Sequence, residues 1–266
     1  MFRRYVPTTS AARNLLSGLL LLALLSQAGL AEPAQARISG GSYLPLYQVG
    51  KVSTRVQVDD FLIDRYPVTN ADFLDFVRNN PKWQRSKVKR IFADDGYLKH
   101  WKSDLEPGSD MVNRPVVNVS WFAAKAYAEW KGKRLPTQDE WEYVARADEK
   151  SQDATKDPEF HRRVLAWYGK PTPNPLPEVG SGFRNVYGVH DLHGVVWEWV
   201  GDFNTVLVTG ESRQDSGIDR GLYCAAGAVG SNDPSDYASY MRYAFRSSLN
   251  ARYTVGNLGF RCASEP

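Results

Sequence analysis

The chain has 266 residues, of which 42% are hydrophobic and 24% charged, as in an ordinary globular protein. That length allows one large domain or two small ones. The formal charge of +3 comes from Arg3, Arg4 and Arg13, and without them the basic and acidic residues balance at 30 each. A nucleic-acid-binding protein would carry a basic surface, so we expect no nucleic-acid partner. The eight Trp and 14 Tyr residues indicate a ring-rich interior or a ring-lined cleft.

The N-terminal residues have the order of a secretory signal peptide. Basic residues precede an apolar run from Leu15 to Leu25, and small residues follow it. Gly29-Leu30-Ala31 is the expected cleavage site, with Ala34-Gln35-Ala36 as a second option. The apolar run is shorter than the length that a helix usually needs to span a membrane, although an uncleaved membrane anchor stays an alternative. We therefore expect a periplasmic or secreted protein with no stable membrane span after cleavage.

The first part of the mature chain predicts short elements joined by long segments. Alternating apolar residues from Val52 to Ile63 predict a strand. Thr69 and Asp72 match a capping box, which predicts a helix that begins near residue 70 and ends before residue 81. Residues 81–113 indicate an irregular segment packed by its aromatic rings.

Two more helices are expected in the middle of the chain. Ser120 follows a short extended run and caps a helix that ends at Gly132. Thr137 and Glu140 form a second capping box, for a helix that reaches about Ala147. Beyond it, the charged residues 148–164 and the four-proline segment 170–177 predict loops.

The C-terminal part predicts a loop followed by strands. Residues 204–222 are polar and indicate a loop, while 221–230, 241–248 and 257–262 indicate short strands. No internal repeat or linker divides the mature chain.

The whole pattern predicts one irregular, loop-rich α+β domain. We place a signal peptide at 1–31, a flexible lead at 32–41 and the domain at 42–266.

The stretch from Asn185 to Asp202 combines two tryptophans, two histidines, three acidic residues and three glycines. Glycine lets a chain turn tightly and bring its carbonyl groups close together. Carboxylates and carbonyls in one turn suit a hard cation such as calcium. The alternative is a Trp-rich core segment with exposed acids. His100 and His161 stand alone in polar surroundings and predict no site.

The chain has two cysteines, Cys224 and Cys262. An oxidising compartment would permit a disulfide between them. Two buried, unpaired thiols are the alternative, because sequence does not show whether the two Cα atoms come within bonding reach.

Several motifs occur in an order that resembles the family of formylglycine-generating enzymes, also called sulfatase-modifying factors. They are Tyr66-Pro-Val-Thr-Asn70, Arg114-Pro-Val-Val-Asn-Val-Ser-Trp121, Gly132-Lys-Arg-Leu-Pro-Thr-Gln-Asp-Glu-Trp-Glu142, Tyr187-Gly188, Asp191-Leu-His-Gly194, Val196-Trp-Glu-Trp199 and Asn257-Leu-Gly-Phe-Arg-Cys262. They cover nearly all of the mature chain. The resemblance implies a fold related to C-type lectins, which agrees with the loop-rich pattern.

The resemblance also implies a chemistry that this chain lacks the residues to perform. Enzymes of the family oxidise a cysteine of a client protein with molecular oxygen and a copper ion held by two cysteines. The corresponding region, 223–240, contains only Cys224. Cu(I) prefers more than one soft thiolate, so copper is not expected here.

Calcium is the cofactor that the resemblance favours. Carried over by position, its ligands are Asp191, the carbonyls of Gly194 and Val196, and the Glu198 carboxylate. The family's usual Asn is Val195 in this chain. An ion-free loop held by side-chain hydrogen bonds is the alternative, and a transition metal shared by the two histidines of the stretch is another.

The resemblance further implies a shallow client groove lined by Trp197 and Arg246. The alternative places Trp197 in the core and Arg246 in a structural ion pair. We predict an exported maturation or accessory factor that acts on or binds a peptide, cofactor or partner enzyme, without copper-cysteine chemistry. Whether it is an enzyme stays open.

Other functions stay open beside this one. They are an oxidoreductase with a different active site in exported siderophore or peptide chromophore maturation, an accessory protein of periplasmic nitrite reduction and, least expected, a formylglycine-generating oxidase.

Overall fold

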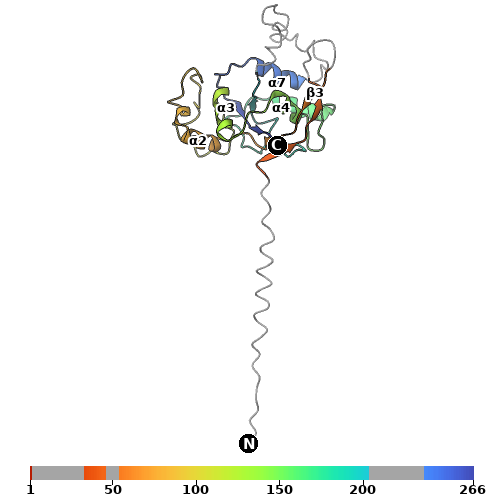
Figure 1. Cartoon of the computed structure of the whole chain (residues 1–266), viewed down its shortest axis with the longest axis horizontal. Coiled ribbons are helices and arrows are strands. Elements are labelled where there is room, and N and C mark those ends of the chain that lie inside the picture. The colour runs from red at the N-terminus through yellow and green to blue at the C-terminus, as the bar shows by residue number, and fades with distance from the viewer. Residues whose placement is uncertain (2–32, 46–53, 204–236) are drawn as a thin grey trace, which may run out of the picture. The chain divides into compact units, whose positions relative to one another are not determined.

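The computed structural model describes residues 1, 33–45, 54–203 and 237–266. The expected signal peptide, the segments 204–222 and 221–230, and Cys224 lie outside the described residues. Residues 34–266 form one compact unit, shown in Figure 1. In the described part of the chain, no helix is long and apolar enough to cross a membrane.

Short strands form three small sheets in the described residues. β1 (Gln35–Ile38), β4 (Phe61–Asp64) and β7 (Ala263–Ser264) make an antiparallel sheet in the order β1-β4-β7. β2 (Gly41–Tyr43) pairs with β3 (Val56–Val58) in an antiparallel ladder. β5 (Trp197–Trp199) pairs with β6 (Leu258–Phe260) in a parallel one.

The segment expected to be a flexible lead is partly a strand. β1 pairs along its whole length with β4, with Ala36 opposite Ile63. Ala36 and Ile38 point into the core and are almost fully buried, whereas Arg37 between them is exposed. Three or four residues of alternation are too few for the sequence pattern to stand out from a polar linker. The strand expected between residues 52 and 63 is in fact β3 and β4, separated by Asp59 and Asp60.

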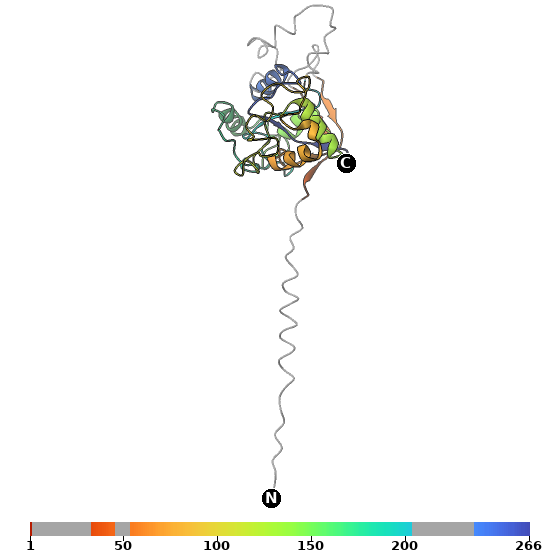
Figure 2. The ribbon, with the colours of Figure 1, turned by 90° about the vertical axis from the view of Figure 1, so that its left-hand side faces the viewer.

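Five helices lie in the described residues, with a short 3-10 turn after the first. They are α2 (Asn70–Asn79), η1 (Pro81–Trp83), α3 (Trp121–Trp130), α4 (Gln138–Ala145), α5 (Pro158–Tyr168) and α7 (Tyr237–Ser247). α2 packs against α3 (Figure 2), and α5 packs against α7.

The predicted helix starts are confirmed. The side chains of Thr69 and Thr137 each accept a hydrogen bond from the backbone amide three residues on, and the carboxylates of Asp72 and Glu140 accept one from the amide of the cap residue. Ser120 caps α3 by accepting from the amide of Ala123. These caps satisfy amide groups that the first helical turn leaves without a partner.

Two helices stand where the sequence indicated a loop and a strand. α5 occupies part of the segment 148–164, and its N-cap Asp157 is followed by Pro158 at the first helical position. α7 replaces the strand expected at 241–248. Its inward face carries Arg242 and Arg246, so the apolar periodicity that marks a helix is missing.

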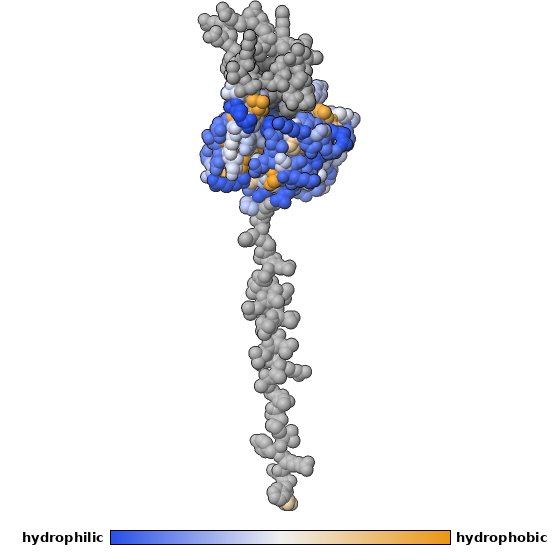
Figure 3. Space-filling model, turned by 90° about the vertical axis from the view of Figure 1, so that its right-hand side faces the viewer, coloured by the Kyte–Doolittle hydropathy of each residue, from blue (hydrophilic) through white to orange (hydrophobic). Residues whose placement is uncertain are grey.

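Aromatic rings fill the main core. Phe73 stacks on Tyr127 with 5.8 Å between ring centroids, and Tyr127 meets Phe260 edge-on at 5.3 Å. Trp101 and Trp199 are also buried in this core. The surface seen in Figure 3 is mostly hydrophilic, with small scattered hydrophobic spots. The ring-rich interior is thus confirmed.

The cap of α4 gives the first testable prediction. We expect Thr137→Ala to lower the free energy of unfolding by about 1 kcal/mol, because the helix loses the acceptor for the Glu140 amide. Urea denaturation measures this loss. Thr137→Ser keeps the hydroxyl and should stay near wild type; equal losses for both substitutions would contradict the capping role.

Candidate functional site

The site is built on β5, where the stretch from residue 185 to 202 reaches its two tryptophans. Trp199 is fully buried, and its indole nitrogen donates to the carbonyl of Val119 at 3.0 Å. Trp197, two residues earlier, is only half-buried. The strand therefore anchors one ring in the core and presents the other near the surface.

Glu198, between them, forms a fully buried ion pair with Arg261. Its two oxygens accept from the guanidinium at 2.8 Å each, and Oε2 also accepts from the Trp141 indole at 2.6 Å. The remaining Arg261 donors reach the carbonyls of Asp64 and His190, at 3.0 and 2.8 Å. Every charge in this pair is thus compensated within the protein.

Asp191 holds the turn before the strand. Its carboxylate accepts from the amides of Gly180 and Gly182, the latter at 2.7 Å. Burial raises the pKa of Asp191, while these two amides act in the opposite direction. Asp191 adopts a left-handed backbone with φ of 63°, and Gly194 has a φ of 116° that a side chain would rarely tolerate.

The side chains predicted to bind calcium do not fit that role in this arrangement. Glu198 is neutralised by Arg261, and Asp191 is held by two backbone amides. Calcium binds through several oxygens that remain free to face the ion. In the described residues no three acidic, histidine or cysteine side chains converge as a metal site. Glu198 is therefore an ion-pair partner, and calcium binding by this turn stays a prediction without support from its side chains.

A second buried ion cluster lies beside the first. Glu142 of α4 accepts from Arg242 at 2.7 Å and from Arg246 at 2.9 Å, both on α7. Burial raises the pKa of Glu142, but the charges of the two arginines outweigh it and hold the pKa below its usual value. Both guanidinium groups also lie over the Trp141 ring, that of Arg246 at 4.5 Å.

This cluster decides between the alternatives for Arg246. The side chain is buried and paired with Glu142, so it belongs to a structural ion pair and not to a client groove. Cys262 is also buried, and burial raises the pKa of its thiol well above the usual value. Its proposed disulfide partner, Cys224, lies outside the described residues.

Trp197 lines a pocket of about 160 Å³, which we call the Trp197 pocket. Its ring stacks on Tyr168 with 5.1 Å between centroids and packs against Trp167 and Phe245. The opposite wall comes from the proline-rich loop after α5 and from Asn257, whose amide donates to Thr172 at 3.2 Å. The full lining is Trp167, Tyr168, Lys170, Thr172, Pro173, Val195, Trp197 and Asn257.

The buried ion cluster contacts this pocket through the hydroxyl of Tyr168. Arg242 donates to the Tyr168 hydroxyl at 3.2 Å. Burial raises the pKa of Tyr168, while the Arg242 charge acts in the opposite direction. The phenol ring is thus fixed at its hydroxyl end and offers its face to Trp197.

The two histidines of the stretch have separate partners. The His193 ring is buried between Trp141, Phe160 and Phe183, and its Nε2 meets the carbonyl of Ala145 at 2.9 Å. A carbonyl only accepts, so Nε2 carries the proton. The His190 ring instead stacks on Tyr66. This arrangement does not support a shared metal.

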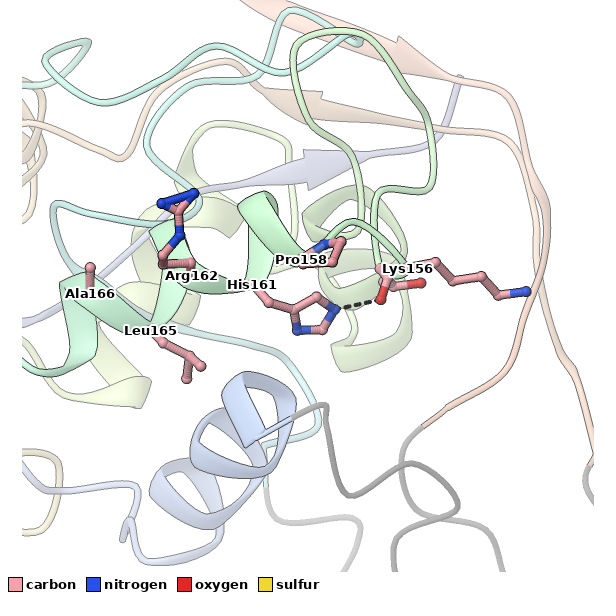
Figure 4. A pocket seen from close by; sticks show the side chains of 7 residues that line it. Lys156, Pro158, His161, Arg162, Leu165 and Ala166 are labelled. Carbon is pink, nitrogen blue, oxygen red and sulfur yellow. Dashed lines mark hydrogen bonds between the residues drawn. The ribbon is translucent and has the colours of Figure 1, made fainter.

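A larger hollow, about 810 Å³, runs along α5. Figure 4 shows His161 and Leu165 on the side of α5 that faces α7, with the His161 ring bonded to the carbonyl of Thr155. Lys156, Arg162 and Ala166 on its margin are exposed. The hollow lacks the enclosing rings of the Trp197 pocket, which we therefore take as the candidate site.

The α5 residues of this pocket were missed by sequence reasoning. Trp167 and Tyr168 end a helix that the charged pattern concealed, and they precede a loop with four prolines. Two adjacent large rings before a rigid loop are the signal that could have marked them.

A family model and the sequences of known relatives identify the family of this chain. Residues 23–266 match the model of the sulfatase-modifying factor enzyme 1-like domain. The inactive C-alpha-formylglycine-generating enzyme 2 of Mus musculus is 34% identical over 94% of this chain and 94% of the relative. The formylglycine-generating enzyme of Streptomyces coelicolor is 34% identical over 79% of this chain and 80% of the relative. Among solved structures, that of PvdO from Pseudomonas aeruginosa has a TM-score of 0.45 and 21% identity, covering 87% of this chain and 94% of that one.

Breaking the Glu198–Arg261 pair tests both its role and the calcium prediction. We expect Glu198→Gln to cost about 3–5 kcal/mol of unfolding free energy, because a buried guanidinium loses its counter-charge. The double change Glu198→Gln with Arg261→Met should recover part of the loss in thermal melting. The calcium prediction is tested by measuring melting temperatures with added calcium and with a chelator. If calcium raises the melting temperature of the wild type and a chelator lowers it, while neither changes that of Glu198→Gln, Glu198 is a calcium ligand.

The buried His193 predicts an acid-sensitive fold. Burial lowers the pKa of His193 to about 3, whereas an unfolded histidine titrates near 6.5. Between these values the unfolded chain binds the extra proton, so stability falls as the pH falls. From pH 7 to pH 5 this one site should cost about 2 kcal/mol. Urea denaturation at both pH values should show a smaller loss for His193→Gln, and equal losses would contradict the assignment.

Proposed function

Because the chain belongs to the sulfatase-modifying factor enzyme 1-like family, we propose that it is an exported maturation or accessory factor that binds a peptide or protein client. The client occupies the Trp197 pocket, and no copper-cysteine chemistry takes place there. The expected fold class, an irregular α+β domain of this family, is confirmed.

The observation that carries the proposal is the half-buried Trp197 ring in a pocket of about 160 Å³. An engineered apolar cavity of about 150 Å³ admits one benzene ring. The Trp197 pocket has the volume for a single aromatic or proline side chain, and its ring faces suit stacking. Lys170 at the same pocket adds a positive charge for a client carboxylate or carbonyl.

The cysteines support a role without the family's copper chemistry. A two-thiolate copper site would need both cysteines of the chain. Cys262 is fully buried, and its amide donates to Asp64 at 3.1 Å. Burial raises the pKa of its thiol, as is usual for a structural cysteine in the core. One relative, similar over 94% of both chains, is itself named an inactive formylglycine-generating enzyme.

Export rests on the N-terminal sequence. Basic residues, the apolar run from Leu15 to Leu25 and the small residues after it are the parts of a cleavable signal. After export, the protein would bind its client in an oxidising compartment.

Removing the Trp197 ring tests the client pocket. Peptides selected on the purified protein from a displayed random library should share an aromatic residue or a proline at one position. Trp197→Ala should weaken their binding by about thirtyfold, the effect of a central aromatic contact, measured by fluorescence anisotropy. Trp130→Ala, which removes an exposed ring from α3, should leave the affinity unchanged.

Two results would contradict the proposal. One is a library that yields no peptide dependent on Trp197. The other is purified protein that contains one copper per chain and converts a client cysteine into an aldehyde, because that outcome is the family's oxidase chemistry.

A further inference from the structure

A second pocket, of about 410 Å³, adjoins the Trp197 pocket. We call it the proline pocket, because Pro115, Pro173 and Pro175 line it. Its volume is within the range of small-molecule sites, about 300–1,000 Å³. Thr172 and Pro173 line the Trp197 pocket as well, so these two residues form a ridge between two neighbouring hollows.

The C-terminal part of the chain holds this ridge in place. Asn257, which lines the Trp197 pocket, donates from its side-chain amide to the Thr172 hydroxyl at 3.2 Å. Gly256, the residue before it, lines the proline pocket. The pyrrolidine ring of Pro173 also restricts the backbone of the ridge. A ligand that covers the ridge therefore has little conformational freedom to remove from the protein.

One apolar cluster lies beneath both pockets. Val117, Leu176, Val195 and Val196 are buried against one another. Val117 and Leu176 line the proline pocket, and Val195 lines the Trp197 pocket. The two pockets thus share an apolar floor, and a ligand that spans the ridge would bury apolar groups on each side of it.

His100 belongs to the wall of the proline pocket, and its polar atoms are engaged within the protein. The Asn70 amide nitrogen donates to the carbonyls of Met111, Arg114 and Pro115, so its oxygen is the end that meets His100 Nε2, at 3.0 Å. An amide oxygen only accepts, so Nε2 carries the hydrogen. Burial is the main cause that lowers the pKa of His100 to about 4. At neutral pH the ring therefore brings no charge to the pocket.

The charged side chains at the two pockets are both positive. Lys170 lines the Trp197 pocket, Lys99 lines the proline pocket, and both are exposed. Among the described residues, no aspartate or glutamate lines either pocket. A partner that carries carboxylates is attracted to such a surface, whereas one that carries lysines or arginines is repelled.

We propose that the Trp197 pocket and the proline pocket form one groove for an acidic peptide segment with two apolar anchor side chains. An aromatic or proline side chain enters the Trp197 pocket, and an aliphatic side chain enters the proline pocket across the ridge. Carboxylates beside the anchors face Lys99 and Lys170. This inference rests on the proposed function and specifies the class of client that the protein binds.

The probes are the library peptides whose binding depends on Trp197. Besides the aromatic or proline position, we expect them to share Leu, Ile, Val or Met at a fixed spacing from it, and to contain more acidic than basic residues. Alanine in place of the aliphatic residue should weaken binding to the wild-type protein by about tenfold, because an apolar side chain loses its buried surface. Fluorescence anisotropy of the labelled peptides measures both dissociation constants.

Gly256 allows the proline pocket to be blocked. A Cβ at this position would meet only the Asn118 side chain, at 3.9 Å, and its φ lies outside the left-handed region. Asn118 lines the same pocket, so Gly256→Leu should fill part of it and weaken peptide binding by about tenfold. Gly256→Ala, the matched control, adds one methyl group and should bind like the wild type. With Gly256→Leu, the parent peptide and its alanine-substituted form should bind equally, because the aliphatic anchor has lost its pocket.

The charge complementarity has its own pair of variants. Lys99→Glu should weaken binding by about fivefold at low ionic strength, and the loss should shrink as salt is added. Lys89→Glu makes the same change of charge at an exposed lysine that lines neither pocket, and it should have no such effect.

The results separate this inference from the proposed function. If peptides depend on Trp197 but bind wild type, Gly256→Leu and Lys99→Glu equally, the proline pocket takes no part and only this inference is wrong. If no peptide depends on Trp197, the proposed function itself fails. The alanine-substituted peptides decide the matter on wild-type protein even if Gly256→Leu does not fold: unchanged affinity at every aliphatic position overturns the second anchor.

Discussion

The buried pair between Glu198 and Arg261 joins two strands of the C-terminal part of the chain, and Arg261 also holds a strand of the N-terminal part. Glu198 stands on β5, and Arg261 follows β6 and donates to the carbonyl of Asp64 on β4. Neither side chain is exposed to solvent. In such a place each charge depends on its partner, because water is not available to screen it. The parallel pairing of β5 with β6 brings the two residues together, so the sheet and the ion pair depend on each other.

Trp141 links the Glu198–Arg261 pair to the residues that position the candidate site. Its indole nitrogen bonds to Glu198, and its ring lies under the guanidinium groups of Arg242 and Arg246. Arg242 in turn holds the Tyr168 hydroxyl. The ring stack of the Trp197 pocket therefore rests on buried charges, and the wall formed by Tyr168 is positioned by contacts that start in the centre of the molecule. A pocket held in this way is formed before its ligand arrives.

The features that sequence could predict are local ones. The capping boxes at Thr69 and Thr137 need only residues three positions apart, and both are confirmed. Helix α7 was predicted as a strand because arginines, and not apolar residues, fill its buried face. These arginines can be buried because they pair with Glu142, which is about a hundred residues away in the chain. The spacing of apolar residues does not reveal a helix whose buried face carries charged side chains that are paired with another element.

The same limit applies to the sites. The turn around Asp191 has the residue types of a cation site, yet the partner of Glu198 lies 63 positions further along. His100 looked isolated because Asn70, which fixes its proton, is 30 positions earlier. Trp197 could be predicted as a pocket residue from the family resemblance, whereas Trp167 and Tyr168 required knowledge of where α5 ends.

The position of β4 in the sheet order has a consequence for folding. β4 lies between β1 and β7, which are far apart in the sequence. Until both have paired with it, β4 has an open edge, and until Arg261 reaches Glu198 the core holds an unpaired charge. Open strand edges and an unfinished core favour aggregation. Contacts between residues that are distant in the sequence form slowly, so the chain is most prone to misassociation before these two pairings are made.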